Sequence, residues 1–546
     1  MSFKITINGE VKSSDKPVRV LDLLSPGHNF YCALVNNRVR ELTYVLKEES
    51  VIDPLTLTHS ESVRIYQTSL RYLVANAMYN IRPDIKIRFS YNVSRSIFIQ
   101  ILNDGVRADR ELVHELDQEM KRLIKADIPF NRSKITVEEA AKIYEERGFD
   151  DKLEVLKYRP ETSVHMYECH GYLNYMYGFM VPSTGYLKQW ILKPYSPGII
   201  LQYPRSECKG EIPEFQDAPT FGKTLKHSHA WSKKAGLESV TGINKIIESG
   251  HEVELINICE ARHYQQLCEL GLRIMEESES LRLICIAGPS SSGKTTFANR
   301  LRIELMSRGL RPIRLSIDDY YLPRGQAPLD EDGKPDLESI YALDVQLFNQ
   351  NMLDLINGEK VQLPKFDFNS GKRVPGRVLQ VEDDQPIIIE GIHALNEQLT
   401  NLIPKHQKFK IYISPQAQIN LDDQNPISLT DLRLLRRLVR DKKFRNASAL
   451  ETMSMWPSVR KGEFKWIYDT QEGADYVYNS VLSYELPVMR KYALPVLEEI
   501  KTESEFFPLA ERLIRMLKYF VDLEDKWVPS NSLMREFIGD SCFQDV

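Results

Sequence analysis

The sequence predicts an α/β protein whose C-terminal half contains an open, doubly wound parallel sheet. Two short apolar runs, Leu283–Ala287 and Pro386–Glu390, are each bounded by turn residues, as buried parallel strands are. From Leu281 onward, a pattern of strand, turn and helix repeats. At the N-terminus, residues 3–7 alternate apolar and polar side chains, which indicates a separate β-rich unit ahead of that sheet.

Length and composition indicate a chain of several globular domains, since 546 residues correspond to roughly three or four. The net charge of −5, from 71 Lys+Arg against 76 Asp+Glu, argues against a nucleic-acid binder that relies on bulk positive charge. The seven scattered cysteines lack metal-ribbon and disulfide spacing, which fits a reducing compartment. The N-terminus reads as a strand rather than a signal peptide, and no apolar stretch approaches the ~20 residues of a membrane span. We therefore expect a cytoplasmic protein with no membrane partner.

Residues 1–65 form the first predicted unit, a small β-rich module. Turn residues at 8–9 and 36–37 predict two hairpins. A short apolar helix is expected at Val18–Leu24, and the last strand is expected to end near Tyr66.

Residues 66–205 change to an α+β pattern. Apolar residues at helical spacing predict a helix over Asp109–Lys125, and a second helix over Val137–Arg147 is stopped by Gly148. Tyrosine-rich, strand-like segments then continue to about Pro204.

The remaining chain divides into three parts. Residues 206–280 are predicted to be a helical connector, and residues 281–500 carry the repeated strand–turn–helix pattern. Residues 501–546 are predicted to be a helical extension, with helical periodicity over Pro508–Asp525.

Gly288–Thr295 is a complete G-x-x-x-x-G-K-[ST] motif between a predicted strand and a predicted helix of about residues 295–308. Glycines let successive backbone N–H groups point at phosphate oxygens, and the helix N-terminus adds a favourable dipole. Lys294 would reach the β- and γ-phosphates, and the Thr295 hydroxyl would ligate Mg²⁺. We therefore expect ATP and Mg²⁺ as cofactors; an N-K-x-D motif, typical of GTPases, is missing from the chain. The expected nucleotide-binding residues of this loop are Gly288, Ser290, Ser291, Ser292, Gly293, Lys294, Thr295 and Thr296.

Acidic residues follow two of the predicted strands. Asp318 and Asp319 end the strand that begins at Arg314, where a carboxylate can take the proton of an attacking hydroxyl. Of the two, we predict Asp318. Glu390 ends an apolar run that resembles a Walker B strand, a position from which a carboxylate can hold Mg²⁺. An Asp-rich turn and a solvent-facing Glu are the structural alternatives.

Arg433, Arg437 and Arg440 are spaced to share one face of a helix. Such a row suits a lid over transferring phosphates, although a solvated basic face fits the pattern equally well. Arg436 lies on a neighbouring face, and Arg445 follows the helix.

Residues 281 to about 480 resemble the uridine kinase and phosphoribulokinase group of P-loop kinases. That resemblance implies ATP-dependent phosphorylation of a small-molecule hydroxyl, with a nucleoside as the leading acceptor. It depends on the order and spacing of the P-loop Gly288–Thr296 and of Asp318–Tyr321, Pro364–Phe368, Ile389–Ile392, Arg436–Asp441 and Ala474–Val477.

The same resemblance implies roles for individual residues. Asp318 would be the general base for a sugar 5′-hydroxyl, and Glu338 falls where an Asp holds the ribose hydroxyls. Phe366 falls where an aromatic ring stacks on the base, and Tyr320 is placed with the acceptor. The implied Mg²⁺ residues are Thr295, Asp318 and Glu390. The implied catalytic residues besides Asp318 are Lys294, Arg437 and Arg440. Arg440 and Arg445 would lie on the ATP side, and Arg437 would lie on the acceptor side.

Two departures from that group leave the acceptor open. Gly371 stands where a base-reading His is expected, and Ala447 replaces an acceptor-side Arg. The loss of buried hydrogen-bonding groups reduces discrimination between substrates. A phosphoribulokinase-, glycerate- or pantothenate-type kinase of the same fold therefore stays an alternative to a uridine- or cytidine-type kinase.

Residues 1–205 resemble the first two domains of threonyl-tRNA synthetase, a TGS β-grasp domain followed by an editing-type domain. Thr68 and Tyr72 occupy the positions of the paired His residues, Cys169 survives, and Leu173 stands at the later His position. One ligand of four cannot hold a metal, so we predict neither zinc nor deacylation there. The N-terminal half then reads as a regulatory, RNA-sensing or assembly module. An RNA-linked, nucleotide-dependent regulator is the alternative to a kinase, and a homo-oligomer also stays open.

Overall fold

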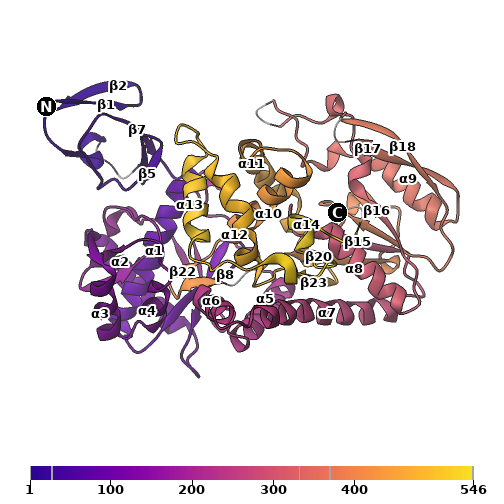
Figure 1. Ribbon diagram of the computed structural model, residues 1–546, viewed down its shortest axis with the longest axis horizontal. Helices are drawn as coiled ribbons and strands as arrows, with labels where there is room; N and C mark the ends of the chain where they lie inside the picture. Colours follow the sequence, from indigo (N-terminus) through magenta and orange to yellow (C-terminus); the bar gives the residue numbers. More distant parts are fainter. Residues whose placement is uncertain are drawn as a thin grey trace.

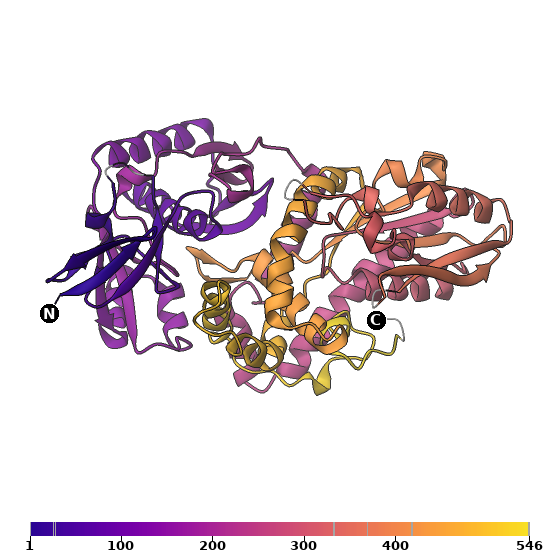
Figure 2. The ribbon, with the colours of Figure 1, turned by 90° about the horizontal axis from the view of Figure 1, so that it is seen from above.

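The computed structural model describes residues 2–25, 27, 29–330, 333–367, 370–416 and 419–543. The molecule is elongated, with the N-terminal units at one end and a parallel sheet at the other (Figure 1). Helices of the C-terminal half lie between these two ends, a separation that is also clear from above (Figure 2). Among the helices of the described residues, none combines the length and apolar character needed to cross a bilayer.

A mixed five-stranded sheet in the order β2-β1-β7-β4-β5 forms the N-terminal unit. Its two predicted hairpins are confirmed, because Asn8-Gly9 and Asn36-Asn37 adopt the positive φ angles that two-residue turns require. The first and last strands, β1 and β7, pair in parallel. The strands are β1 (Phe3–Ile7), β2 (Glu10–Ser14), β4 (Cys32–Val35), β5 (Arg38–Arg40) and β7 (Ser50–Leu55), with β3 (Val18–Arg19) and β6 (Val45–Leu46) pairing beside them.

Two sequence predictions for this region are wrong. The expected helix at Val18–Leu24 is the short strand β3 followed by a single 3₁₀ turn. The strand expected to end near Tyr66 ends at Leu55, and helix α1 (Ser60–Ile81) follows. Helix α1 is buried on nearly every side, so its sequence lacks the polar stripe that identifies a helix. The predicted boundary after residue 65 therefore falls inside α1.

The second unit packs helices on two antiparallel sheets, in the orders β13-β14-β9-β8 and β10-β11-β12. Both predicted helices are confirmed as α2 (Arg110–Lys125) and α3 (Val137–Arg147). Asp109 caps α2, and Gly148 ends α3 in the left-handed region. The other elements are α4 (Asp150–Leu156), β8 (Ile87–Val93), β9 (Ser96–Ile101), β10 (Asn131–Thr136), β11 (Ser163–Cys169), β12 (Tyr172–Tyr175), β13 (Ile191–Tyr195) and β14 (Gly198–Gln202).

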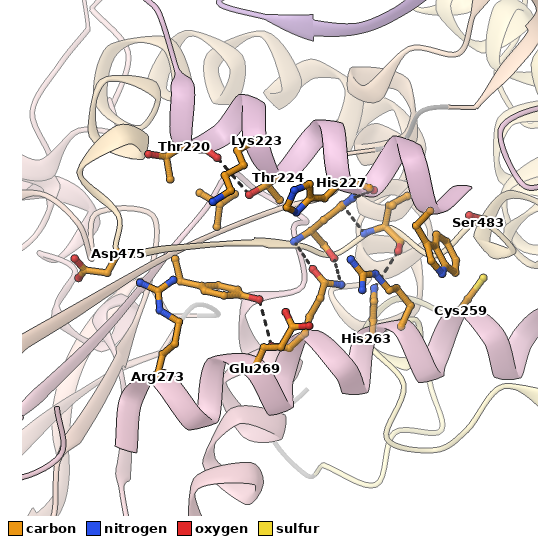
Figure 3. Close-up of a pocket in the computed structure, with 18 residues that line it drawn as sticks. Thr220, Lys223, Thr224, His227, Cys259, His263, Glu269, Arg273, Asp475 and Ser483 are labelled. Carbon is orange, nitrogen blue, oxygen red and sulfur yellow. Dashed lines mark hydrogen bonds between the residues drawn. The ribbon is translucent and has the colours of Figure 1, made fainter. Parts of the chain in front are cut away.

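Three helices follow: α5 (Pro219–Lys234), α6 (Val240–Glu248) and α7 (Glu252–Glu276). Helix α7 is more than a connector, because Leu267, Leu270 and Ile274 pack into one core of the parallel sheet. A cleft of about 290 Å³ lies between α5 and α7, lined by polar side chains that Figure 3 draws. Among the described residues, no P-loop residue lines this cleft, so it is separate from the candidate site below.

The C-terminal half contains the predicted parallel sheet, in the order β16-β19-β15-β20-β23 with every pair parallel. Alternate residues of the central strand β15 enter two different cores: Leu283 and Cys285 enter one, Ile284 and Ile286 the other. Burial on both faces explains why its sequence is a continuous apolar run. The elements are β15 (Leu283–Ala287), α8 (Lys294–Ser307), β16 (Ile313–Ser316), α9 (Val345–Ile356), β17 (Val361–Asp367), β18 (Lys372–Leu379), β19 (Ile387–Glu390), β20 (Lys408–Ser414) and β23 (Tyr476–Asn479).

Five further helices complete this half: α10 (Leu429–Phe444), α11 (Ala449–Trp466), α12 (Glu485–Glu498), α13 (Phe507–Leu517) and α14 (Arg535–Ile538). The helix expected over Pro508–Asp525 ends at Leu517. Turns then lead the chain back to the parallel sheet, where α14 lies. The C-terminal segment is therefore more than a helical extension of the chain, because its last part packs onto the domain that contains the parallel sheet.

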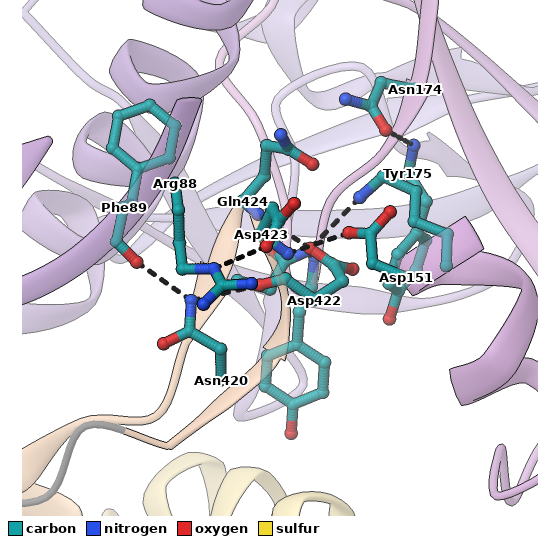
Figure 4. Close-up of polar contacts among 12 residues, drawn as sticks. Arg88, Phe89, Asp151, Asn174, Tyr175, Asn420, Asp422, Asp423 and Gln424 are labelled. Atoms are coloured by element: carbon teal, nitrogen blue, oxygen red, sulfur yellow. Dashed lines mark hydrogen bonds and ion pairs between the residues drawn. The ribbon is translucent and has the colours of Figure 1, made fainter. Parts of the chain in front are cut away.

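A hairpin of β21 (Asn420–Asp422) and β22 (Asn425–Pro426) joins the two halves of the molecule (Figure 4). Phe89 donates its N–H to the carbonyl of Asp423 and accepts a bond from the Asn420 amide, both at 2.9 Å. Arg88 pairs with the Asp423 carboxylate at 2.5 Å. Beneath them, the buried side chains of Lys152 and Asp422 form an ion pair at 3.0 Å. The hairpin then runs directly into α10.

Candidate active site

The loop between β15 and α8 has the backbone geometry of a phosphate cradle. Glycine is required at Gly288, where a Cβ would lie 2.0 Å from the carbonyl oxygen of Ile413. Gly293 has a φ of 91°, in the left-handed region. Lys294 folds back over the loop and donates to the carbonyls of Gly288 at 3.0 Å and Pro289 at 3.1 Å. The lysine is thus held beside the N-terminus of α8.

Several hydroxyl groups of this loop are free to bind an anion. Within the described part of the chain, the hydroxyls of Ser291, Ser292 and Thr296 are buried without a hydrogen-bond partner. Buried polar groups are normally satisfied, so an unpaired set at a helix N-terminus fits a bound phosphate. The loop therefore suits the phosphates of ATP.

Two carboxylates lie at the carboxyl ends of neighbouring strands. Ser316 of β16 is in register with Glu390 of β19, and Asp318 follows in the 3₁₀ turn after β16. Burial raises the pKa of Glu390 to about 7, and Asp318 adds to this effect. Burial also raises the pKa of Asp318, although Lys294 opposes it. A divalent cation close to these two carboxylates would stabilise their charged forms.

Mg²⁺ fits this corner only together with other ligands. No cluster of three or more His, Cys, Asp or Glu side chains among the described residues is arranged to hold a metal ion. Mg²⁺ usually binds through one or two protein oxygens, several waters and substrate phosphates. Thr295, Asp318 and Glu390 are accordingly the residues that would hold it.

Asp319 differs from Asp318 in its partner. Its carboxylate accepts the backbone N–H of Phe366 at 3.3 Å and so holds strand β17. Asp318 instead interacts electrostatically with Lys294 and Arg445. This difference favours Asp318 as the general base.

The arginines predicted to form a lid, Arg437, Arg440 and Arg445, lie near the P-loop and Asp318; we call helix α10, which carries the first two, the lid helix. Arg437 donates to the Ser290 hydroxyl at 2.9 Å, and Arg440 bonds to Asp441 at 2.7 Å. The charge of Arg440 is the largest factor that lowers the pKa of Arg445, to about 10. Arginines this close, sharing one carboxylate, leave an excess of positive charge that an anion would neutralise.

Three further side chains hold the P-loop in place through contacts that the sequence pattern does not predict. Arg433 donates to the carbonyl of Ser290 at 3.0 Å, and Arg436 donates to that of Ser291 at 3.3 Å. Glu463 of α11 accepts the N–H of Ser290 at 3.2 Å. The sequence predicts Arg433 only as part of the arginine row of one helix face, and Glu463 cannot be told from a surface-exposed Glu of a helix. These side chains fix the loop to α10 and α11.

The two residues predicted to contact the acceptor lie near the carboxylates, because Glu338 interacts with the charge of Asp318 and the N–H of Phe366 bonds to Asp319. Burial raises the pKa of Glu338 to about 7, with a further contribution from Glu463 and an opposing one from Arg437. His393 bonds to the backbone carbonyl of Glu338 at 3.0 Å and fixes its position.

Tyr320 does not fit its expected place with the acceptor. It is 2% exposed, packs its ring on Phe348 and accepts a hydrogen bond from Asn351 at 3.1 Å. The 3₁₀ turn directs this side chain into the core, whereas the ring of Tyr321 lies 5.8 Å from that of Phe366. We therefore leave Tyr320 out of the site.

The two departures from the kinase pattern lie outside helices and strands, Gly371 in a turn and Ala447 in a loop. Gly371 has a φ of 65° between β17 and β18, so the turn itself favours glycine. Ala447 donates its N–H to the carbonyl of Asp441 just after α10. Phe368, the last residue of the quoted Pro364–Phe368 motif, lies outside the described residues.

In the second unit, the side chain of Tyr72 lies between helix α1, which carries it, and strands β11 and β12. Its hydroxyl donates to the carbonyl of Tyr167 at 3.0 Å, and its ring packs on Phe130 and Tyr172. Burial raises the pKa of the Cys169 thiol to about 12, which disfavours the thiolate that a metal needs. The absence of zinc stays a prediction.

Comparison with known proteins identifies the C-terminal half. Residues 283–486 match the family described as Phosphoribulokinase / Uridine kinase. The chain is 32% identical over 197 residues to the uridine kinase of Staphylococcus haemolyticus, covering 36% of this chain and 86% of that protein. The chain belongs to the phosphoribulokinase/uridine kinase family.

A second curated relative and one solved structure are also similar to this chain. The uridine kinase of Staphylococcus aureus strain Newman is also 32% identical over 197 residues, with 36% and 86% coverage. A structure described as a possible uridine kinase from Bacillus stearothermophilus is 20% identical, covers 36% of this chain and 89% of its own, and has a TM-score of 0.23. The family match over residues 283–486 includes the P-loop, Asp318, Glu390 and helix α10.

Proposed function

We propose that this family member is an ATP-dependent small-molecule kinase that transfers the γ-phosphoryl group to a nucleoside 5′-hydroxyl. The observation that carries the proposal is the convergence of Lys294, Asp318 and Glu390 at the carboxyl ends of neighbouring strands. A carboxylate base serves a hydroxyl acceptor, and a simple nucleotide switch has no need of one.

The nucleotide phosphates would occupy the P-loop. Its backbone N–H groups and the hydroxyls of Ser291, Ser292 and Thr296 would bind the phosphate oxygens, while Lys294 neutralises charge. Mg²⁺, held by Thr295, Asp318 or Glu390 and by waters, would supply further charge neutralisation when bound. Arg437, Arg440 and Arg445 would face the phosphates, exclude water and stabilise the charge that spreads during transfer.

Asp318 would act on the acceptor. Its raised pKa lies closer to neutrality than that of an ordinary Asp, which improves its efficiency as a proton acceptor. It would take the hydroxyl proton as the oxygen attacks the γ-phosphorus in line with the leaving oxygen.

A nucleoside fits the acceptor side better than a sugar phosphate does. Glu338 offers a carboxylate for ribose hydroxyls, and Phe366 offers an aromatic ring for a base. A second phosphate on the acceptor would be repelled by this carboxylate, which sits near Glu463. Which base is read stays open, because Gly371 offers no side chain.

We further propose that the N-terminal units keep the TGS and editing-domain folds without editing chemistry. The mixed sheet with parallel β1 and β7, and the Tyr72 side chain among the strands, support this assignment. Their role would then be regulation or assembly.

The test is ADP formation by the full chain with Mg²⁺-ATP and a panel of nucleosides, glycerate, pantothenate and sugar phosphates. We expect one or more nucleosides to stimulate ADP formation and to be recovered as 5′-monophosphates. Asp318→Asn should lower kcat by about 10³-fold or more, whereas the matched Asp319→Asn should lose far less. ADP formation that needs no acceptor, or that responds only to RNA, would contradict the proposal.

A further inference from the structure

The C-terminal segment, residues 528–543, lies over the P-loop. Its short helix α14 is placed between the lid helix α10 and the P-loop helix α8 (Figure 1). Glu536 of α14 accepts the backbone N–H of Thr296 at 3.0 Å. Thr296 is in the first turn of α8, where the N–H groups are free of helix partners and attract anions.

Glu536 supplies the chemistry that a phosphate would supply. Its carboxylate presents negative charge and an acceptor oxygen to the positive end of the α8 dipole. The side chain is 8% exposed, and Lys294 and Arg314 lie close enough to interact with its charge. A ligand phosphate and Glu536 would therefore compete for the N–H of Thr296.

Apolar residues of the same segment close this side of the loop. Leu533 packs against Gly293 so closely that a Cβ at Gly293 would lie 2.5 Å from a Leu533 methyl carbon. Ser292 and Thr296, whose hydroxyls are unpaired within the described residues, are each 0% exposed beneath this cover. The hydroxyls that suit a phosphate are thus shielded from solvent.

The lid helix holds the other side of the segment. The guanidinium of Arg436 lies 5.0 Å from the ring centre of Phe537, which is fully buried, and Lys443 donates to the carbonyl of Ile538. Arg535 fixes α14 to the start of the segment and to the turn before it, because it donates to the carbonyls of Val528 at 2.7 Å and Asp525 at 2.8 Å. The segment is therefore a preformed unit that bridges the lid and the P-loop.

We propose that residues 528–543 are an intramolecular ligand of the P-loop that competes with the nucleotide, with Glu536 in the place of a phosphate group. This inference rests on the proposed nucleotide site. The nucleotide binds fully only when the segment leaves the loop, so its apparent affinity is reduced by the fraction of molecules in the closed form. Release of the segment also frees Arg436 and Lys443 of the lid from their contacts with α14.

The first experiment measures ADP binding to the full chain by titration calorimetry. Glu536→Gln removes the charge but keeps the size of the side chain, and should lower the Kd for ADP about tenfold. Asp540→Asn is the matched control, since it removes the same charge from the same segment at a side chain that is 81% exposed. We expect its Kd to equal that of the wild type.

The second experiment uses only the wild-type chain, so it does not depend on how a variant folds. Amide hydrogen exchange of residues 528–543 should become faster when ADP is added. An unchanged or slower rate, or an unaltered Kd in Glu536→Gln, would overturn the inference while leaving the kinase proposal intact. If neither the wild type nor the variants bind ADP, the proposed function fails, and this inference fails with it.

Discussion

Glu390 and Glu338 are the two carboxyl groups of the candidate site whose pKa lies near neutrality. Burial raises the pKa of each to about 7 from a usual value of 4.5. In both cases the protonated form is favoured in the folded state. Below pH 4.5 these groups therefore do not oppose folding, and stability is lost as the pH rises through 7. These two carboxyl groups therefore lower the stability of the folded protein near neutral pH, where the proposed kinase would work.

Replacing Glu390 should show this effect directly. Glu390→Gln should raise the free energy of unfolding of the metal-free protein by up to about 3 kcal/mol at pH 8, but by a small fraction of that at pH 5. Thermal unfolding at the two pH values measures the difference. Glu382→Gln, at an exposed position, should change Tm little at either pH. An equal gain at both pH values would show that packing, rather than charge, causes it.

Glu463 has the opposite effect on stability, because its charge is paired. It is fully buried, accepts from Arg433 at 3.0 Å, and also pairs with Arg460. Glu463→Gln would leave the buried guanidinium of Arg433 and the partly buried one of Arg460 with too little negative charge, at a cost of about 3 kcal/mol. Urea unfolding should show that loss, while Glu451→Gln, in the capping box of the same helix, should cost about 1 kcal/mol or less. Similar losses in the two variants would contradict the argument.

At the scale of elements, prediction from sequence succeeded where local signals are complete. The signals of these elements lie within a few positions of one another. They are the apolar run of strand β15, the caps of helix α3 and the turn residues of both N-terminal hairpins. Helix α1 was missed because it is buried nearly all round and so has no amphipathic period. The P-loop, Asp318 and Glu390 could be predicted as candidate site residues, because each lies at or just after the end of a recognisable strand. Glu463 and Glu536 could not, since only tertiary packing brings them to the loop.

The start of the lid helix is held by the rest of the molecule. Asp431, in the first turn of α10, pairs with Arg64 of α1 at 3.2 Å and with Arg512 of α13. Burial alone would raise the pKa of Asp431, but the two arginines hold it below its usual value. Position and charge therefore make Asp431 the anchor of the lid.

Removing this anchor charge should destabilise α10. Asp431→Asn leaves Arg64 and Arg512 beside a neutral side chain, so we expect a loss of about 3 kcal/mol and a lower Tm. The loss should shrink as the pH falls below the usual Asp value of 3.8 and through the lower pKa of Asp431 in the folded protein, because protonation then removes the same charge in the wild type. Asp336→Asn, outside this cluster, should have little effect on Tm. A loss that does not depend on pH would point to packing instead.

At the scale of the whole molecule, the β21–β22 hairpin makes the N-terminal units and the kinase domain one structure. It bonds to the backbone of Phe89 in β8 of the second unit, through the Asp423 carbonyl and the Asn420 side-chain amide, and its next residues begin the lid helix. The deepest contact is the ion pair of Lys152 and Asp422, each about 1% exposed or less. An uncompensated charge at such a depth costs several kcal/mol, so this pair couples the folding of the two halves.

Calorimetry should reveal that coupling. The wild-type chain should unfold in one main transition, because unfolding of either half would leave Lys152 or Asp422 buried in the other half without its partner. Lys152→Met should separate it into two transitions, with the N-terminal units unfolding first, since Asp422 would remain buried without its cation. Lys157→Met, which removes a lysine that is 64% exposed just after α4, should keep the single transition. Two transitions in the wild type would mean that the hairpin binds the halves together without coupling their stability, and the N-terminal units would then be free to unfold without disturbing the lid.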